Sequence, residues 1–119
     1  MRLEDKTALD RVNVSPSIIQ EWINLLRSGT INQHIGAFSC VDDDDNWSYC
    51  AMGVLGIIGK RKMYGPEYNC RIDGSYAESI LASVIGTEFA NELSASVVTM
   101  NDSDGLSFEQ IADWLDQTL

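Results

Sequence analysis

Positively charged residues are missing from the C-terminal part of this sequence. Residues 72–119 contain nine aspartates and glutamates and no lysine or arginine, whereas residues 1–71 contain nine acidic and eight basic residues. The formal net charge of −10 therefore belongs almost entirely to the C-terminal part. Because such a surface repels nucleic acid, the sequence argues against direct nucleic-acid binding and favours a protein partner with a basic surface.

Histidine, cysteine and long apolar runs are also scarce. One histidine in 119 residues leaves few options for general acid–base catalysis, and three cysteines in a chain without a signal sequence favour reduced thiols. The longest apolar run, residues 51–58, contains two glycines and is much shorter than the ~20 residues that span a bilayer. We therefore expect no membrane contact and a cytoplasmic location.

The length and the hydrophobic share of 45% fit a single domain covering residues 1–119, with residues 1–14 as a loose N-terminal arm. Periodic apolar residues and capping signals predict a mainly α fold of four to five helices with a small antiparallel β-hairpin. An α+β fold is the alternative. Residues 37–41 and 47–50 are the expected hairpin strands, because a polar turn separates them.

Local signals set the boundaries of the first two helices. Ser15–Pro16 predicts the start of a helix that ends near Gly29, since proline suits the first helical position and glycine the C-terminal cap. The apolar segment 50–58 predicts a buried helix. A loop over residues 59–71 should follow, with a short edge strand near residues 68–72.

Three further helices are predicted in the acidic part. Ser75 and Glu78 form the pattern of a capping box at the start of one helix, and Thr87 is placed to cap the next. The last helix has the clearest start, because Ser107 as N-cap and Gln110 three residues later complete a capping box.

Asn101 and Asp102 fall between the last two predicted helices. We expect them to form a turn, because short polar side chains bond readily to nearby backbone, with a functional site as the alternative. The helical stripes also predict the core, which should comprise Ile19, Trp22, Leu26, Val54, Leu55, Ile58, Leu81, Leu93, Ile111 and Leu115.

Carboxylates repeat at helical spacing in the acidic part. They are three or four residues apart, so each set lies on one side of its helix. A solvated face that keeps the protein soluble is one interpretation. The other is an array that imitates phosphates and occupies a basic groove, since ordinary solvated helices mix both signs. The predicted partner-binding residues are Glu88, Glu92, Glu109, Asp113 and Asp116.

A cluster of bases near the middle of the chain offers a second hypothesis. One interpretation is a surface loop that partly balances the acids. The other is an anion site for a small nucleotide, with a tyrosine to stack on the base. The residues of this alternative site are Lys60, Arg61, Lys62, Tyr64 and Arg71.

Other constellations do not match known chemistry. The acidic run 42–45 lacks the glycine and glutamate that a calcium loop places at its sixth and twelfth positions. His34, Cys40, Cys50 and Cys70 include no close pair of the kind that zinc sites use, and no nucleophile signature flanks the cysteines. We expect no metal, no cofactor and no enzymatic activity. A redox or metal role of the cysteines is the alternative.

Three stretches carry a resemblance. They are a Trp-containing helix ending in Ser-Gly (22–29, followed by Gln33), a Tyr-Cys segment leading into Gly-Val-Leu (49–55), and Met-Asn-Asp (100–102) with Ser-Phe-Glu-Gln-Ile-Ala-Asp (107–113). In these stretches the chain resembles a group of small bacteriophage and prophage proteins. The resemblance covers about half of the chain and assigns no catalytic residue. It implies a viral origin and, by analogy, an anti-defence role such as DNA mimicry or anti-CRISPR inhibition.

Two functions follow from these observations. The first is a non-enzymatic inhibitor whose acidic helical face binds a basic surface on a host defence or nucleic-acid-handling protein. The alternative is a protein that sequesters a small anionic signalling nucleotide near the bases 60–62 without cleaving it. Either would act in the cytoplasm of the bacterial host cell, and a homo-oligomer is compatible with both.

Overall fold

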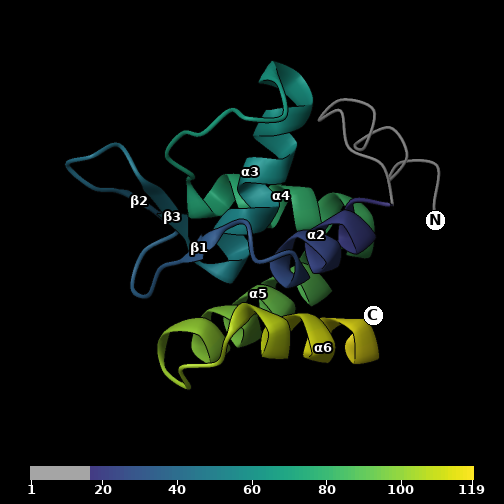
Figure 1. Ribbon diagram of the computed structural model, residues 1–119. Helices are drawn as coiled ribbons and strands as arrows, with labels where there is room; N and C mark the ends of the chain where they lie inside the picture. Colours follow the sequence, from purple (N-terminus) through teal and green to yellow (C-terminus); the bar gives the residue numbers. More distant parts are fainter. Residues whose placement is uncertain (1–16) are drawn as a thin grey trace.

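Five helices and a small sheet make up the part of the chain described by the computed structural model, residues 17–119 (Figure 1). This confirms the predicted mainly α fold. The expected arm 1–14 and the expected helix start at Ser15–Pro16 lie outside the described residues. None of the described helices has the length and hydropathy needed to cross a membrane. The helices are α2 (Ile18–Arg27), α3 (Ala51–Tyr64), α4 (Gly74–Ile85), α5 (Thr87–Asp102) and α6 (Phe108–Thr118).

Helix α3 is the centre of the fold and contacts α2, α4 and α5. Every residue from Ala51 to Gly59 is buried, so the first part of the helix shows no polar face. Glycines allow the close packing: a Cβ at Gly53 would collide with the backbone carbonyl of Phe38, and one at Gly56 would press on Ile72. The segment therefore behaves as a core helix whose neighbours approach its backbone directly.

The C-terminal part of α3 corrects a prediction. The helix does not end at Ile58 but continues to Tyr64, so the bases 60–62 lie on a helix and not in a loop. Basic residues in the last turn are favourable there, because the C-terminal end of a helix carries partial negative charge. Gly65, with φ of 122°, ends the helix. The predicted edge strand over residues 68–72 is also wrong, since no strand forms there.

The predicted hairpin is confirmed and gains a third strand. β2 (Ser39–Val41) and β3 (Trp47–Tyr49) pair antiparallel, with Cys40 opposite Ser48. β1 (Asn32–Gln33), which the sequence did not reveal, pairs parallel with β3 and gives the order β1-β3-β2. Figure 1 shows this sheet at one side of the helices, with the β2–β3 turn projecting away from them.

Two of the predicted helix starts in the acidic part are displaced. Asp73, and not a Ser75–Glu78 box, caps α4, because its carboxylate accepts the Ser75 backbone N–H. The N-cap of α5 is Gly86, one residue before the expected Thr87. The start of α6 is confirmed with both hydrogen bonds of the capping box present.

The core follows the predicted stripes with one exception. Ile19 is half-buried, and its neighbour Ile18 takes the fully buried position on α2. The other nine predicted core residues are buried. Trp22 anchors α2 to the start of α3 by donating its indole N–H to Ala51 O at 2.8 Å.

Candidate functional site

The acids of α5 lie on one exposed face of that helix. Glu88 and Glu92 are both exposed and have no ion-pair partner among the described residues. At about 100° per residue, Ala95, Ser96 and Thr99 continue the same face toward the C-terminal end of α5. These small residues form the floor of a groove of about 400 Å³. The two glutamates therefore lie on the same face of α5 as these lining residues, about one and two turns before them.

The acids of α6 lie on the side of α6 that is turned away from the α5 groove. Asp113 and Asp116 face α2, where Arg27 Nη2 donates to Asp113 Oδ1 at 2.7 Å and to Asp116 Oδ2 at 3.4 Å. The hydrogen bond to Asp113 raises the pKa of the Arg27 guanidinium. Trp114, on the other edge of α6, lines the groove beside α5. Glu109 is exposed and has no ion-pair partner in the described chain.

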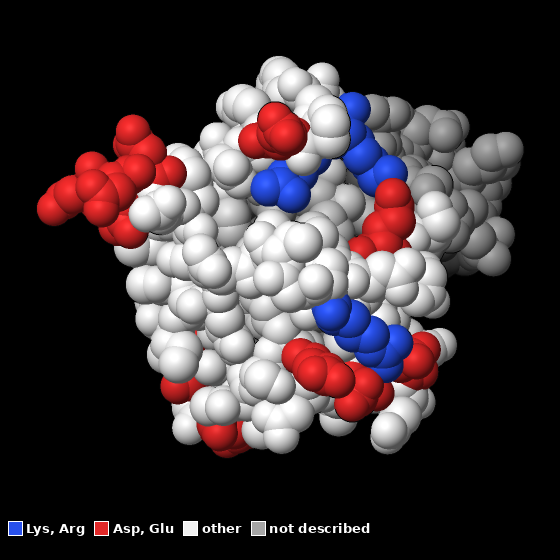
Figure 2. Space-filling model, in the orientation of Figure 1, with Lys and Arg blue, Asp and Glu red and all other residues white. Residues whose placement is uncertain are grey.

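The structure thus divides the predicted acidic face into two sets. The α5 set adjoins the groove, and the α6 set lies across the α6 ridge from it, with two of its three carboxylates partly neutralised by Arg27. Figure 2 shows both kinds of acid on the face that it draws. Each lysine or arginine (blue) lies next to an acidic residue (red), and other acidic residues lie away from any base. Of the five predicted partner-binding acids, Glu88, Glu92 and Glu109 therefore have no ion-pair partner in the part of the chain that the structure describes.

The bases of the alternative site point in different directions. Lys60 Nζ lies 4.4 Å from the centre of the Tyr76 ring, and Lys62 Nζ forms an ion pair with Glu21 Oε1 at 2.9 Å. Consecutive residues on a helix diverge by about 100°, so three adjacent bases cannot converge on one anion. Arg71 is exposed and in the segment after α3, with no strand or helix to hold it.

Tyr64, also part of the alternative site, is 62% exposed at the end of α3. Its ring packs against that of Tyr68, with 4.9 Å between the centroids and a tilt of 40°. The predicted five-residue nucleotide site is therefore not assembled as one surface.

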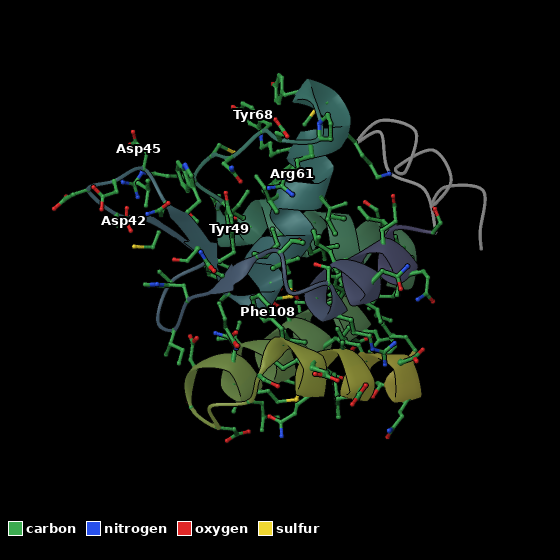
Figure 3. The ribbon with its side chains drawn as sticks, in the orientation of Figure 1. Asp42, Asp45, Tyr49, Arg61, Tyr68 and Phe108 are labelled. Atoms are coloured by element: carbon green, nitrogen blue, oxygen red, sulfur yellow. The ribbon has the colours of Figure 1, made fainter. Side chains whose placement is uncertain are left out.

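Arg61 differs from its neighbours, because two cavities meet at it. One is a groove of about 520 Å³ between α2 and the end of α3, with Leu25, Ile58 and Pro66 among its lining residues. The other is a polar pocket of about 230 Å³ between α3 and the sheet. Figure 3 shows Arg61 on α3 and Tyr49 on β3 on adjoining sides of the space between the helix and the hairpin.

Polar and aromatic side chains line the smaller pocket. Asn32, Asn46 and Asn69 supply amide groups, and Trp47 and Tyr49 supply rings stacked at 6.1 Å with an interplanar angle of 11°. Burial raises the pKa of Tyr49 to about 12, although the nearby Arg61 guanidinium acts in the opposite direction. The tyrosine hydroxyl therefore stays protonated. Sequence patterns indicated only Arg61 and none of these five residues, because they come from three separate segments of the chain.

The acidic hairpin turn is organised by its first residue. Asp42 Oδ1 accepts the backbone N–H groups of Asp44 at 2.8 Å and Asn46 at 2.9 Å. These bonds, the one from Asn46 first, lower the pKa of Asp42. The expectation of a polar turn is confirmed, and the remaining carboxylates of the turn are exposed.

The cysteines and the histidine do not gather. Across residues 17–119, no group of three or more histidine, cysteine and acidic side chains has the geometry to hold a metal ion. Cys50 is buried as the N-cap of α3, with Sγ accepting from Gly53 N at 3.4 Å, and burial raises the pKa of its thiol. A thiol in this state is a weak nucleophile. Cys40 and Cys70 are half-buried and free.

Asn101 is the main correction to the predicted site. It is not part of a turn: Asn101 and Asp102 are the last two residues of α5, and Asn101 is fully buried. Its Nδ2 donates to His34 O at 2.8 Å, and its Oδ1 accepts from Gln33 Nε2 at 2.9 Å and from Ala51 N at 3.2 Å. The side chain joins the end of α5 to the start of α3 and to the segment around β1.

The three stretches in which we expect a resemblance to phage proteins meet at this junction. Trp22 bonds to the first residue of α3, Gln33 bonds to Asn101 and to Leu106 O, and Cys50 caps α3. At least one residue of each stretch, Trp22, Gln33, Cys50 or Asn101, therefore takes part in the bonds that hold the fold together. A comparison of the chain with known protein families, with curated proteins and with solved structures finds no match in any of the three.

Proposed function

We propose that this protein is a non-enzymatic inhibitor of phage type that binds a basic surface on a host defence or nucleic-acid-handling protein in the bacterial cytoplasm. The observation that carries the proposal is the charge of residues 72–119, nine acids without a base, of which seven lie within the three helices α4, α5 and α6. Because the carboxylates are fixed to helices, little conformational entropy is lost when they meet a partner. The surface can imitate the phosphates of nucleic acid at such a partner.

The proposed contact surface runs from the unpaired acids of α5, along the α5–α6 groove and over α6 to Glu109 on the other side of that helix. Glu92 and Glu88 lie about one and two turns before the α5 residues that line the α5–α6 groove, and Glu109 lies in the first turn of α6. Trp114 and Met100 line the groove and offer apolar contact area at its centre. An apolar centre with a charged rim is the usual composition of a protein–protein interface.

Capture from a bacterial lysate, quantified by mass spectrometry, tests this surface. The test variant combines Glu88→Gln, Glu92→Gln and Glu109→Gln. The control combines Asp43→Asn, Asp44→Asn and Glu67→Gln, which remove the same charge from exposed positions outside the face. We expect the test variant to lose a basic protein that the wild type and the control both retain. Equal retention by both variants would refute the proposed surface.

A further inference from the structure

We propose that Arg61 and the two cavities that meet at it form a binding site for a small cyclic nucleotide, with the phosphodiester at Arg61 and the base in the polar pocket. This activity is independent of the acidic face. It also differs from the cluster that the sequence suggested. Lys60 lies against Tyr76, Lys62 lines the larger cavity but is paired with Glu21, and most of the lining of the polar pocket comes from the sheet and its turn.

The guanidinium of Arg61 is held in place while part of it stays available. Its Nε donates to Tyr68 O at 2.9 Å and its Nη2 donates to Asn69 Oδ1 at 2.9 Å. No bond from Nη1 is present within residues 17–119. Because one side of the group is anchored, its free N–H groups are fixed relative to the cavities. Two such donors form the fork that binds oxygen pairs of phosphate or carboxylate groups.

The polar pocket has the chemistry of a base-binding site. The Trp47 ring offers a surface on which a flat heterocycle stacks, a contact of about 1–3 kcal/mol per base in single-strand binding proteins. Asn32 has no side-chain hydrogen bond within the described chain, and Asn46 uses only its Nδ2, which donates to Asp42. Their free amide groups can pair with the donors and acceptors at the edge of a base.

The volumes of the two cavities and the charges of their lining residues indicate which kind of nucleotide fits. The pocket of about 230 Å³ is smaller than the ~300–1,000 Å³ of ordinary ligand sites, whereas the adjoining groove of about 520 Å³ leaves room for a sugar. Asp45 also lines the pocket, and the Lys62–Glu21 ion pair lines the groove, so each positive group of the two cavities is matched by one carboxylate. A phosphodiester carries a single negative charge, and a phosphate monoester carries about −1.5 to −2 at pH 7. The site therefore favours the cyclic form.

Nuclear magnetic resonance of the three tryptophan indoles tests the site in the full-length protein. The probes are 3′,5′-cyclic AMP and 3′,5′-cyclic GMP, with 5′-AMP, 5′-GMP and inorganic phosphate for comparison. A cyclic nucleotide should shift the Trp47 indole signal and leave those of Trp22 and Trp114 in place, since neither lines the two cavities. An unchanged Trp47 signal with both cyclic nucleotides at about 1 mM, a concentration that detects even weak sites, would overturn the proposal.

Variants identify the groups that bind. Arg61→Met should weaken binding roughly 10- to 100-fold, the usual range for a lost charged hydrogen bond. Arg71→Gln removes the same charge from an exposed residue that lines neither cavity and should leave affinity unchanged. Asn32→Ala tests the pocket without removing a hydrogen bond of the fold, and it should also weaken binding. Equal losses from the Arg61 and Arg71 variants, or none from Asn32→Ala, would contradict the site.

Asp45→Asn tests the charge argument. Asn tolerates the positive φ of 62° at this position, so the backbone should not change. The preference for a cyclic nucleotide over its 5′-monophosphate should shrink in this variant. If the preference is absent in the wild type, or is unchanged in the variant, the assignment to a monoanionic ligand is wrong.

Discussion

Replacement of Asn101 by alanine should destabilise the protein more than any exposed polar substitution. The side chain is fully buried, and it accepts the Ala51 N–H and donates to the His34 carbonyl. In Asn101→Ala both backbone groups lose their partner and water has little access to them. Gln33 keeps a second bond, to Leu106 O at 2.8 Å. The loss should therefore come mainly from two unsatisfied backbone groups.

The expected magnitude follows from these two groups. A buried polar group left without a hydrogen bond costs about 1–3 kcal/mol, and His34 is only half-buried, so we expect a loss of about 2–4 kcal/mol in the free energy of unfolding. Domains of this size are typically stable by about 5–15 kcal/mol, so the variant should fold but with a much smaller margin. With a urea dependence of about 1–3 kcal/mol per M, the midpoint should fall by roughly 1–2 M.

Urea unfolding followed by tryptophan fluorescence measures this loss, because Trp22 is fully buried and bonded to Ala51. Asn91→Ala is the matched control, since Asn91 is exposed on the same helix. It should stay within about 0.5 kcal/mol of the wild type. If Asn101→Ala also stayed within that range, the junction would not hold the fold together and the reasoning would fail.

Four further outcomes are expected. Gly53→Ala should destabilise more than Gly56→Ala, because its new Cβ meets the backbone carbonyl of Phe38, whereas the Cβ at position 56 meets a side-chain methyl group of Ile72. Thermal unfolding ranks the two variants. Hydrogen bonds, first from the Ser75 hydroxyl, lower the pKa of Asp73 in the folded protein. The carboxylate therefore stabilises the fold above its unfolded pKa of about 3.8, and this stabilisation is lost as pH falls through the lowered folded pKa. The melting temperatures of wild type and Asp73→Ala should converge in acid. Cys50 should resist alkylation at neutral pH until the protein unfolds, because burial raises its pKa, and mass spectrometry of the native protein would expose an error. Arg27→Gln should lower the melting temperature slightly at low salt and have no effect in about 1 M salt, where exposed ion pairs are screened.

The sequence predicted correctly those features that depend on interactions between residues close together in the chain. The α6 capping box, the hairpin around residues 42–46 and the left-handed glycine after α2 all depend on residues a few positions apart. The sequence predicts an end of α3 six residues too early, because the lysines and arginine at 60–62 are residue types that are common in surface loops. They are compatible with the end of a helix that Gly65 terminates.

Distant contacts could not be predicted from one sequence. Asn101 looked like a turn residue because its partners Gln33, His34 and Ala51 lie 50 to 68 positions away. The exposure of the α6 acids was predicted correctly, but their pairing with Arg27 joins residues 86 and 89 positions apart. The cavities at Arg61 likewise exist only once α2 and the sheet are placed beside α3.

The salt dependence of partner binding tests the central claim most directly. The basic protein captured by the wild type would be purified and its dissociation constant measured between about 50 and 300 mM salt, a range in which screening of exposed charges becomes strong. We predict that affinity falls steeply with salt. The slope should be flatter for the variant lacking the charges of Glu88, Glu92 and Glu109, and unchanged for the control lacking those of Asp43, Asp44 and Glu67. An affinity independent of salt, or the same slope in all three proteins, would contradict the account.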